Sequence, residues 1–195
     1  MIADQIKNDT HTHHQALEAL MVRQLKSMKS ITDYTDILEI FYSYFGGLEQ
    51  QIKLQLRDDL AIDQRRKAGD LAADIEYFGA LTPDFATGND LPQIESHLQA
   101  IGALYVIEGS TLGGIYISKM ISKQLELNDA NGLSFFNGYG DNTMNMWTDF
   151  KNYLNEQPKN EAEEEEIIAA ANETFMKFKL WMDHYPKLKL TLQNE

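Results

Sequence analysis

The chain has 195 residues, of which 30 are acidic and 17 basic, so its formal net charge is −13. A chain this acidic is a poor candidate for binding nucleic acid or an anionic membrane surface, because both need clustered Lys and Arg. The absence of cysteine excludes disulfides, thiolate nucleophiles and cysteine-based metal sites. No apolar run approaches the roughly 20 residues that a membrane helix needs. One cytoplasmic domain over residues 1–195 is therefore expected.

Apolar residues spaced three and four positions apart predict an all-α protein, and no strand-like alternation appears. Six helices are expected, over residues 2–28, 32–56, 64–79, 94–127, 144–155 and 161–181. Thr32 or Asp33 would cap the second helix, and Pro92 suits the first turn of the fourth. Residues 128–142 are rich in Asn, Gly and Asp and are expected to form a loop. The predicted fold is a single multihelical bundle.

Glycines interrupt two of the predicted helices. Gly46 and Gly47 lie inside the second helix, and Gly109, Gly113 and Gly114 lie inside the fourth. Each glycine costs roughly 1 kcal/mol relative to alanine in a helix interior, so each group needs a reason. The pair in the second helix indicates a close approach of another helix or a bend. For the three in the fourth helix, close packing and contact of the backbone with a flat ligand are equally open, while the spacing of a phosphate-binding loop is absent.

Three of the five histidines cluster on the first predicted helix, at His11, His13 and His14. Zinc and di-iron sites on helices draw further His or carboxylate ligands from neighbouring helices, and no H-E-x-x-H motif occurs here. An axial ligand to haem iron needs only one neutral imidazole. His13 and His14 point about 100° apart, so both cannot face the core. Spacing does not select between them, and a partly exposed histidine without a ligand role stays open.

Together these features resemble the haem oxygenase family, in particular its bacterial biliverdin-producing branch, often found beside bacteriophytochromes. The resemblance covers nearly the whole chain, and the match in the first helix selects His14 over His13. The segments that carry it are Thr10 with His14-Gln15-Ala16-Leu17-Glu18, Phe41 to Glu49, Arg65-Arg66-Lys67 with Leu71, Asp74 and Gly79, Tyr105 to Gly114, and Ala171-x-x-x-Phe175 with Trp181. The stretch from Tyr105 to Gly114 is the most specific match.

The resemblance implies that haem lies between the first helix and a kinked, glycine-rich distal helix. His14 would be the proximal iron ligand, and Glu18, one turn on, would influence its orientation or that of nearby water. The backbone at Gly109, Gly113 and Gly114 would lie against the macrocycle. The implied activity is oxidative cleavage of haem to biliverdin with release of iron and carbon monoxide, with haem as both cofactor and substrate and dioxygen as co-substrate.

The residue after the first distal glycine departs from the animal enzymes, which place an aspartate there to organise water for proton delivery. This chain has Ser110, so Ser110, Thr111 and ordered water become candidates for the proton relay beside Gly109 and Gly113. A hydroxyl has no charge to tune that water. A non-catalytic haem-binding or haem-trafficking protein of the same fold is therefore the main alternative. A thiaminase-like, haem-free relative is a third, although its usual active-site cysteine is missing.

Haem propionates are anionic, so local cations must oppose the net charge. Lys7 lies two turns before His14 on the same face and matches a propionate-contacting lysine of the family. Lys151 falls near a further family cation, and Tyr105 could donate its hydroxyl to a propionate or pack on the ring edge. Phe175 and Phe178 are interpreted as core residues. The histidines interpreted as structural or surface residues are His11, His13, His97 and His184.

Electrons for the reaction must come from outside, because no Rossmann or flavin-binding motif occurs. A ferredoxin or a separate reductase is thus implied as partner. Docking an acidic ferredoxin would need a local basic face on this acidic chain, to which Lys119, Lys123, Lys177 and Lys179 are possible contributors.

Overall fold

The computed structural model describes residues 1–195 except 57–59, 61, 66, 128–130 and 193–195. Within these residues the chain is all-α, as predicted, with no strand. The helices are α1 (Ile2–Asp9), α2 (His11–Ser27), α3 (Ile31–Gln55), α4 (Ala68–Tyr77), α5 (His97–Leu125), α6 (Ser134–Asn137), α7 (Thr143–Glu156) and α8 (Glu161–Leu192). Three short 3-10 turns join them, η1 (Ile62–Gln64), η2 (Gly88–Asp90) and η3 (Gly140–Asn142).

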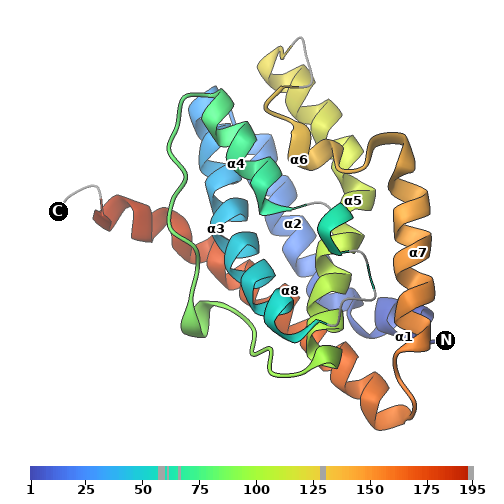
Figure 1. The fold of residues 1–195 in the computed structure, drawn as a ribbon. Helices are drawn as coiled ribbons and strands as arrows, with labels where there is room; N and C mark the ends of the chain where they lie inside the picture. Colours follow the sequence, from blue (N-terminus) through green and yellow to red (C-terminus); the bar gives the residue numbers. More distant parts are fainter. Residues whose placement is uncertain (57–59, 61, 66, 128–130, 193–195) are drawn as a thin grey trace.

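The centre of the bundle is formed by α3, α5 and α8, with α8 crossing behind the other two (Figure 1). Gly102 of α5 lies directly on the Ile167 carbonyl of α8, where a Cβ atom would overlap that oxygen. Burial of large side chains such as Tyr44 of α3 supplies the main driving force. Against this centre α2 packs along α8, while α1 packs on α7 and α8.

The first predicted helix is divided at Thr10 into α1 and α2. Thr10 has φ −96° and ψ −4°, and its hydroxyl donates to the Ile6 carbonyl at 2.6 Å. Thr10 is buried, and the Ala3 N–H donates to Asn155 Oδ1 of α7 at 3.1 Å, so tertiary contacts hold both sides of the turn. The expectation of one helix over 2–28 was wrong here, because the apolar spacing is the same on both sides of the break.

The neighbour of Gly46 and Gly47 is a loop and not a helix. A Cβ atom at Gly46 would overlap the Phe85 ring, and one at Gly47 would overlap the Ala86 carbonyl oxygen. The Ala86 N–H donates to the Ser43 carbonyl at 2.9 Å. The two glycines therefore let the connection between α4 and α5 lie flat on α3.

Helix ends differ from the expectations by a few residues. Ser30 caps α3 and forms a capping box with Asp33, so Asp33 is the third helical residue and not the cap. Ser96 caps α5 by accepting the Gln99 N–H at 3.1 Å, which leaves Pro92 outside the helix. The loop expected over 128–142 contains α6 and η3, and α8 continues past Trp181 to Leu192. Residues 66 and 128–130 lie outside the described residues.

α5 runs without a break through its glycines. It is also long and apolar enough to cross a membrane by length and composition. However, 61% of its most apolar window is buried inside the fold, as expected for the core helix of a bundle.

Candidate functional site

A cavity of about 590 Å³ lies between α2 and α5, and we call it the α2–α5 cavity. This volume falls in the usual range for small-molecule sites. Its inner wall is aromatic, built by α3, α6 and α8 from Phe41, Phe45, Phe135, Phe136, Phe175 and Phe178. All six rings are buried, so the interior would receive an apolar molecule.

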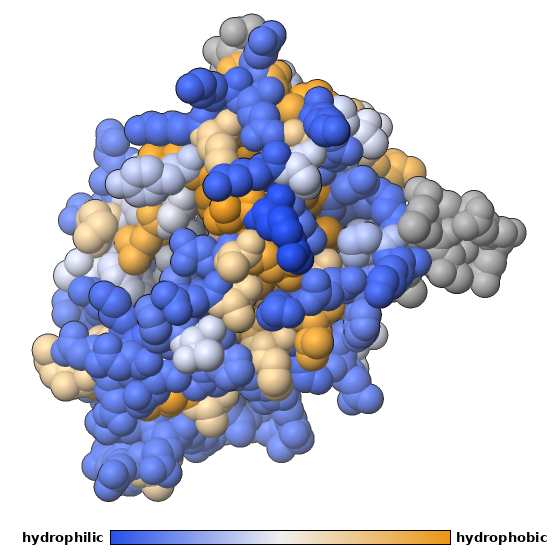
Figure 2. All heavy atoms as spheres, turned by 180° about the vertical axis from the view of Figure 1, so that it is seen from behind, coloured by the Kyte–Doolittle hydropathy of each residue, from blue (hydrophilic) through white to orange (hydrophobic). Residues whose placement is uncertain are grey.

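The mouth of the cavity is polar and open to solvent. Lys7, His11, His14 and Glu18 line it from α1 and α2, and Tyr116 lines it from α5 with 76% of its surface exposed. Figure 2 views the face on which α2 lies, where a strip of hydrophobic side chains shows between hydrophilic ones. A bound molecule would therefore have an apolar body inside and a polar edge at the mouth.

The structure brings His14 to the cavity and leaves His13 outside its lining. The His14 ring meets the edge of Phe175, with centroids 5.4 Å apart and planes at 61°. Phe175 is thus both a core residue and a lining residue, as is Phe178. His11, interpreted from sequence as a surface residue, shares the cavity with His14. Its spacing of three residues from His14 was the sequence signal for a shared face.

The three glycines of α5 have different surroundings. A Cβ atom at Gly114 would overlap the Phe136 carbonyl oxygen, so this glycine serves close packing. At Gly113 nothing lies within 4 Å of the Cβ position, and at Gly109 only the Trp147 ring does, at 3.8 Å. Gly109 and Gly113 line the α2–α5 cavity, whereas Gly114 does not. Two of the three glycines therefore leave bare backbone facing the cavity.

The two hydroxyl candidates for proton delivery are separated. Ser110 lines the cavity, and its hydroxyl donates to the Ile107 carbonyl at 2.7 Å. Thr111 is buried outside the lining and donates to the Glu108 carbonyl at 2.6 Å. Ser110 is therefore the hydroxyl that a molecule in the cavity would meet.

Tyr105 and Lys151 both lie near the Trp147 ring. Tyr105 lines the cavity, its ring centroid 5.7 Å from that of Trp147. Burial raises the pKa of its phenol, and a hydrogen bond with the Thr10 side chain partly opposes this. Lys151 is outside the lining, with its ammonium 6.0 Å from the Trp147 ring centroid. Trp147 itself lines the cavity, and sequence reasoning missed it.

Asp74 of α4 positions part of the aromatic wall. Its carboxylate oxygens accept the Ser134 and Phe135 N–H groups, each at 2.9 Å, at the start of α6. Burial raises the pKa of Asp74, although these hydrogen bonds oppose the shift. The side chain thus fixes the short helix that carries Phe135 and Phe136 into the cavity.

A buried ion pair lies directly beside Gly109. The Glu108 carboxylate contacts Arg65 Nη1 at 2.7 Å, with side-chain exposures of 1% and 5%, and accepts the Tyr139 hydroxyl at 2.9 Å. The guanidinium carbon lies 5.6 Å from the Phe150 ring centroid of α7. The pair therefore joins the residue after η1 to α5 and α7, and nothing in the sequence indicated that Arg65 and Glu108 meet.

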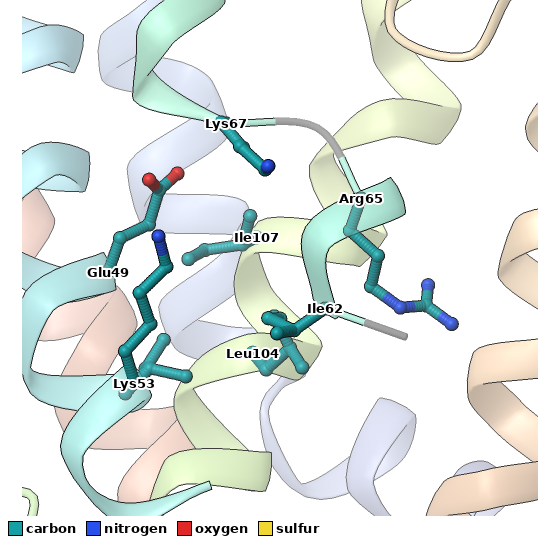
Figure 3. Close-up of a pocket in the computed structure, with 8 residues that line it drawn as sticks. Glu49, Lys53, Ile62, Arg65, Lys67, Leu104 and Ile107 are labelled. Carbon is teal, nitrogen blue, oxygen red and sulfur yellow. The ribbon is translucent and has the colours of Figure 1, made fainter. Parts of the chain in front are cut away.

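Figure 3 shows Arg65 beside a second cavity. The Arg65 side chain extends away from Glu49 and Lys53. This cavity, between α3 and α5, measures about 20 Å³. Such a volume suits a water molecule and excludes an organic ligand.

Within the part of the chain that the structure describes, no three His, Asp or Glu side chains are placed to hold a metal ion. A metal at His14 would therefore need most of its ligands from a non-protein group. The geometry disfavours a di-iron or zinc site and suits a metal inside a macrocycle.

Comparisons with known proteins agree with this geometry. The family model described as Heme oxygenase matches residues 1–184. Among solved structures, the fold is similar to the haem oxygenase of Neisseria meningitidis, whose crystal structures have NO and CO bound. The TM-score is 0.76 and the sequence identity 22%, and the match covers 93% of this chain and 90% of that one. It is also similar to the haem oxygenase of Leptospira interrogans, with a TM-score of 0.73, 19% identity and coverage of 93% and 98%. No curated protein sequence matches.

Proposed function

The chain belongs to the haem oxygenase family, and we propose that it is an enzyme that binds haem and cleaves it to biliverdin with release of iron and carbon monoxide. One observation carries the proposal. The α2–α5 cavity presents a histidine on one wall and, at Gly109 and Gly113, bare helix backbone on the other.

The residues present fit a haem group. The aromatic interior suits the apolar part of the ring, and the open mouth suits its two carboxylates. His14 offers an imidazole and belongs to no group of three metal-binding side chains among the described residues, and a metal already held by a macrocycle needs only one such imidazole.

We assign the iron to His14, whose ring is steadied by the edge of Phe175. Glu18, one turn on and also at the mouth, would orient His14 or water near it. Lys7 and the Tyr105 hydroxyl would bind the propionates, because both line the cavity. Lys151 lies outside the lining, near the Trp147 ring, and would act on the propionates through its charge.

Bound haem would supply the iron chemistry that activates dioxygen, the co-substrate. Gly109 and Gly113 would leave the distal wall without side chains at these two positions, so that a small molecule fits between helix and ring there. Ser110 would hold a water molecule for proton delivery, since a hydroxyl both donates and accepts. Gly114 contributes by letting α5 rest on Phe136.

The electrons would come from an external ferredoxin or reductase, because the sequence contains no flavin or nicotinamide motif. We place the protein in the cytoplasm, in agreement with its lack of cysteine. The second candidate function is haem binding without turnover, favoured by Ser110 in place of an acid.

A haemin titration tests the proposal, followed by ascorbate in air. Wild type should develop a sharp Soret band that His14→Ala alters and that the matched control His13→Ala leaves unchanged. The band should then decay as biliverdin absorbance appears. A band altered only by His13→Ala would move the ligand, and a Soret band that persists under reductant would favour the binding protein.

A further inference from the structure

Three side chains of the types that bind metal ions follow one another along α2, on the face that lines the α2–α5 cavity. They are His11, His14 and Glu18, and we call them the donor row. Glu18 is the only acidic residue in this helix, so it does not belong to a general acidic surface. The donor row therefore offers two imidazoles and one carboxylate at the mouth of the cavity.

The spacing of the donor row places its neighbouring members within one turn of helix. His11 and His14 are three residues apart, and His14 and Glu18 are four apart, so the Cβ atoms of each pair lie about 5–6 Å from one another. Metal sites on helices use both spacings, three residues in di-iron bundles and four residues in helical zinc sites. Because His14 belongs to both pairs, it has a second donor on either side.

The donor row has no competing protein partner among the described residues. All three side chains are exposed, and none of them takes part in a hydrogen bond or an ion pair with that part of the chain. His14 meets Phe175 through a contact between rings and not through a hydrogen bond. By contrast, Nε2 of His97 lies 3.2 Å from Oε1 of Gln157. The imidazoles and the carboxylate of the row can therefore bind an ion without losing a bond to the protein.

The charges around the mouth favour a cation at the Glu18 end of the donor row. With histidine counted as neutral, the charged residues that line the cavity are Glu18 and Lys7. Lys7 belongs to α1, on the other side of the break at Thr10, and precedes Glu18 by eleven residues. The chain as a whole carries a net charge of −13, which raises the concentration of cations near the molecule.

We propose that the donor row binds a divalent transition-metal ion when the cavity holds no haem, and that it holds the ferrous iron released by the reaction. The second half of this inference rests on the proposed function. No three donors converge among the described residues, so two bind the ion at a time and water fills its remaining positions. Imidazole and carboxylate are the protein ligands of non-haem Fe(II) sites. Released iron would thus exchange ligands only, staying ferrous, with no electron transferred.

Calorimetric titration of haem-free protein with Co²⁺, an air-stable substitute for ferrous iron, tests the site without turnover. The donor-row variant, His11→Ala/Glu18→Gln, keeps His14 and removes both of its partners. The matched control, His13→Ala/Asp4→Asn, removes an exposed histidine and an exposed carboxylate outside the lining. Losing even an outer-shell partner costs a metal site about 10–100-fold in affinity, so the donor-row variant should bind Co²⁺ at least about tenfold more weakly. The control should match wild type.

Competition between Co²⁺ and haemin gives the second readout, because both use His14. In wild type, Co²⁺ at ten times its Kd should lower the apparent haemin affinity about tenfold. The same Co²⁺ concentration should have less effect on the donor-row variant, and Mg²⁺, which prefers oxygen ligands, should have none on either protein. Equal Co²⁺ affinity in wild type and the donor-row variant would overturn the metal site. So would Co²⁺ binding that leaves the haemin affinity of wild type unchanged.

Turnover with ascorbate in air, with the ferrous-iron chelator ferrozine present, tests the second half of the inference. In each sample the ferrozine signal is compared with biliverdin absorbance, so the rate of ring opening cancels. The ferrozine signal should lag behind biliverdin in wild type and in the control, and the lag should shorten in the donor-row variant. An equal lag in all three proteins would overturn the role in iron release. Co²⁺ binding without any biliverdin formation would sink the proposed function and leave the metal site standing.

Discussion

Replacing Arg65 with methionine should lower the free energy of unfolding by about 3–5 kcal/mol, because it strands a buried carboxylate. Glu108 is 1% exposed and contacts Arg65 at 2.7 Å, so water cannot replace the lost partner. The Tyr139 hydroxyl remains as a side-chain donor to Glu108. Methionine keeps the apolar contact with Phe150, which isolates the electrostatic loss. An effect of this size is a large share of the roughly 5–15 kcal/mol that stabilises a typical domain.

A double-mutant cycle separates the charge effect from packing. Glu108→Gln alone should also destabilise, since it leaves the guanidinium buried without a counter-charge. The double variant Arg65→Met/Glu108→Gln should recover most of the loss, because exchanging a whole buried pair for neutral groups is often close to neutral. The glutamine still accepts the Tyr139 hydroxyl.

Urea unfolding followed by tryptophan fluorescence measures these free energies. The matched control is Lys179→Met, which removes an exposed pair with exposures of 39% and 43% and should cost under about 1 kcal/mol. The reasoning fails if Arg65→Met lies within about 1 kcal/mol of wild type, or if the double variant is no more stable than either single one.

Three further outcomes are expected. Gly114→Ala should lower the free energy of unfolding by about 1–3 kcal/mol, because the added methyl group overlaps the Phe136 carbonyl. Gly113→Ala should keep or slightly raise the melting temperature and should weaken haemin binding. The pKa of Asp74 is raised above its ordinary 3.8, so wild-type stability relative to Asp74→Asn should fall as pH rises above about 4 in urea titrations and then level off. Lys7→Ala should weaken haemin binding about tenfold, because a charge-assisted contact is worth roughly 1.5–3 kcal/mol; unchanged affinity in a Soret titration would remove it from the site.

Sequence periodicity was enough to predict most of the fold. The apolar spacing that defines a buried stripe is a local property, so α3, α5 and α7 appear within a few residues of their expected ends. The break at Thr10 was not predicted, because it depends on the Thr10 hydroxyl and on contacts with α7, and neither alters the spacing of apolar residues. The extension of α8 past Trp181 was not predicted, and it contains Pro186, a residue type that ordinarily interrupts a helix.

The candidate site was predictable where its residues share one helix face. His11 and His14 share a face of α2, although His11 was set aside, and Lys7 on α1 reaches the same cavity across the break at Thr10. Trp147 and the Arg65–Glu108 pair come from segments far apart in the chain. No periodicity encodes a contact over 43 residues, and charged side chains are ordinarily expected at the surface.

Adjacent glycines show why a motif alone does not assign roles. Gly113 and Gly114 differ by one residue and by about 100° around α5, so one faces the cavity and the other lies on Phe136. Gly114 packs α5 against α6, and Glu108 holds α5 to the residues that follow η1 and precede η3. Because the helix is held on its packed side, its bare side can remain a fixed wall despite two glycines that would otherwise loosen it. A wall that is rigid and bare at Gly109 and Gly113 would place a ligand by its shape.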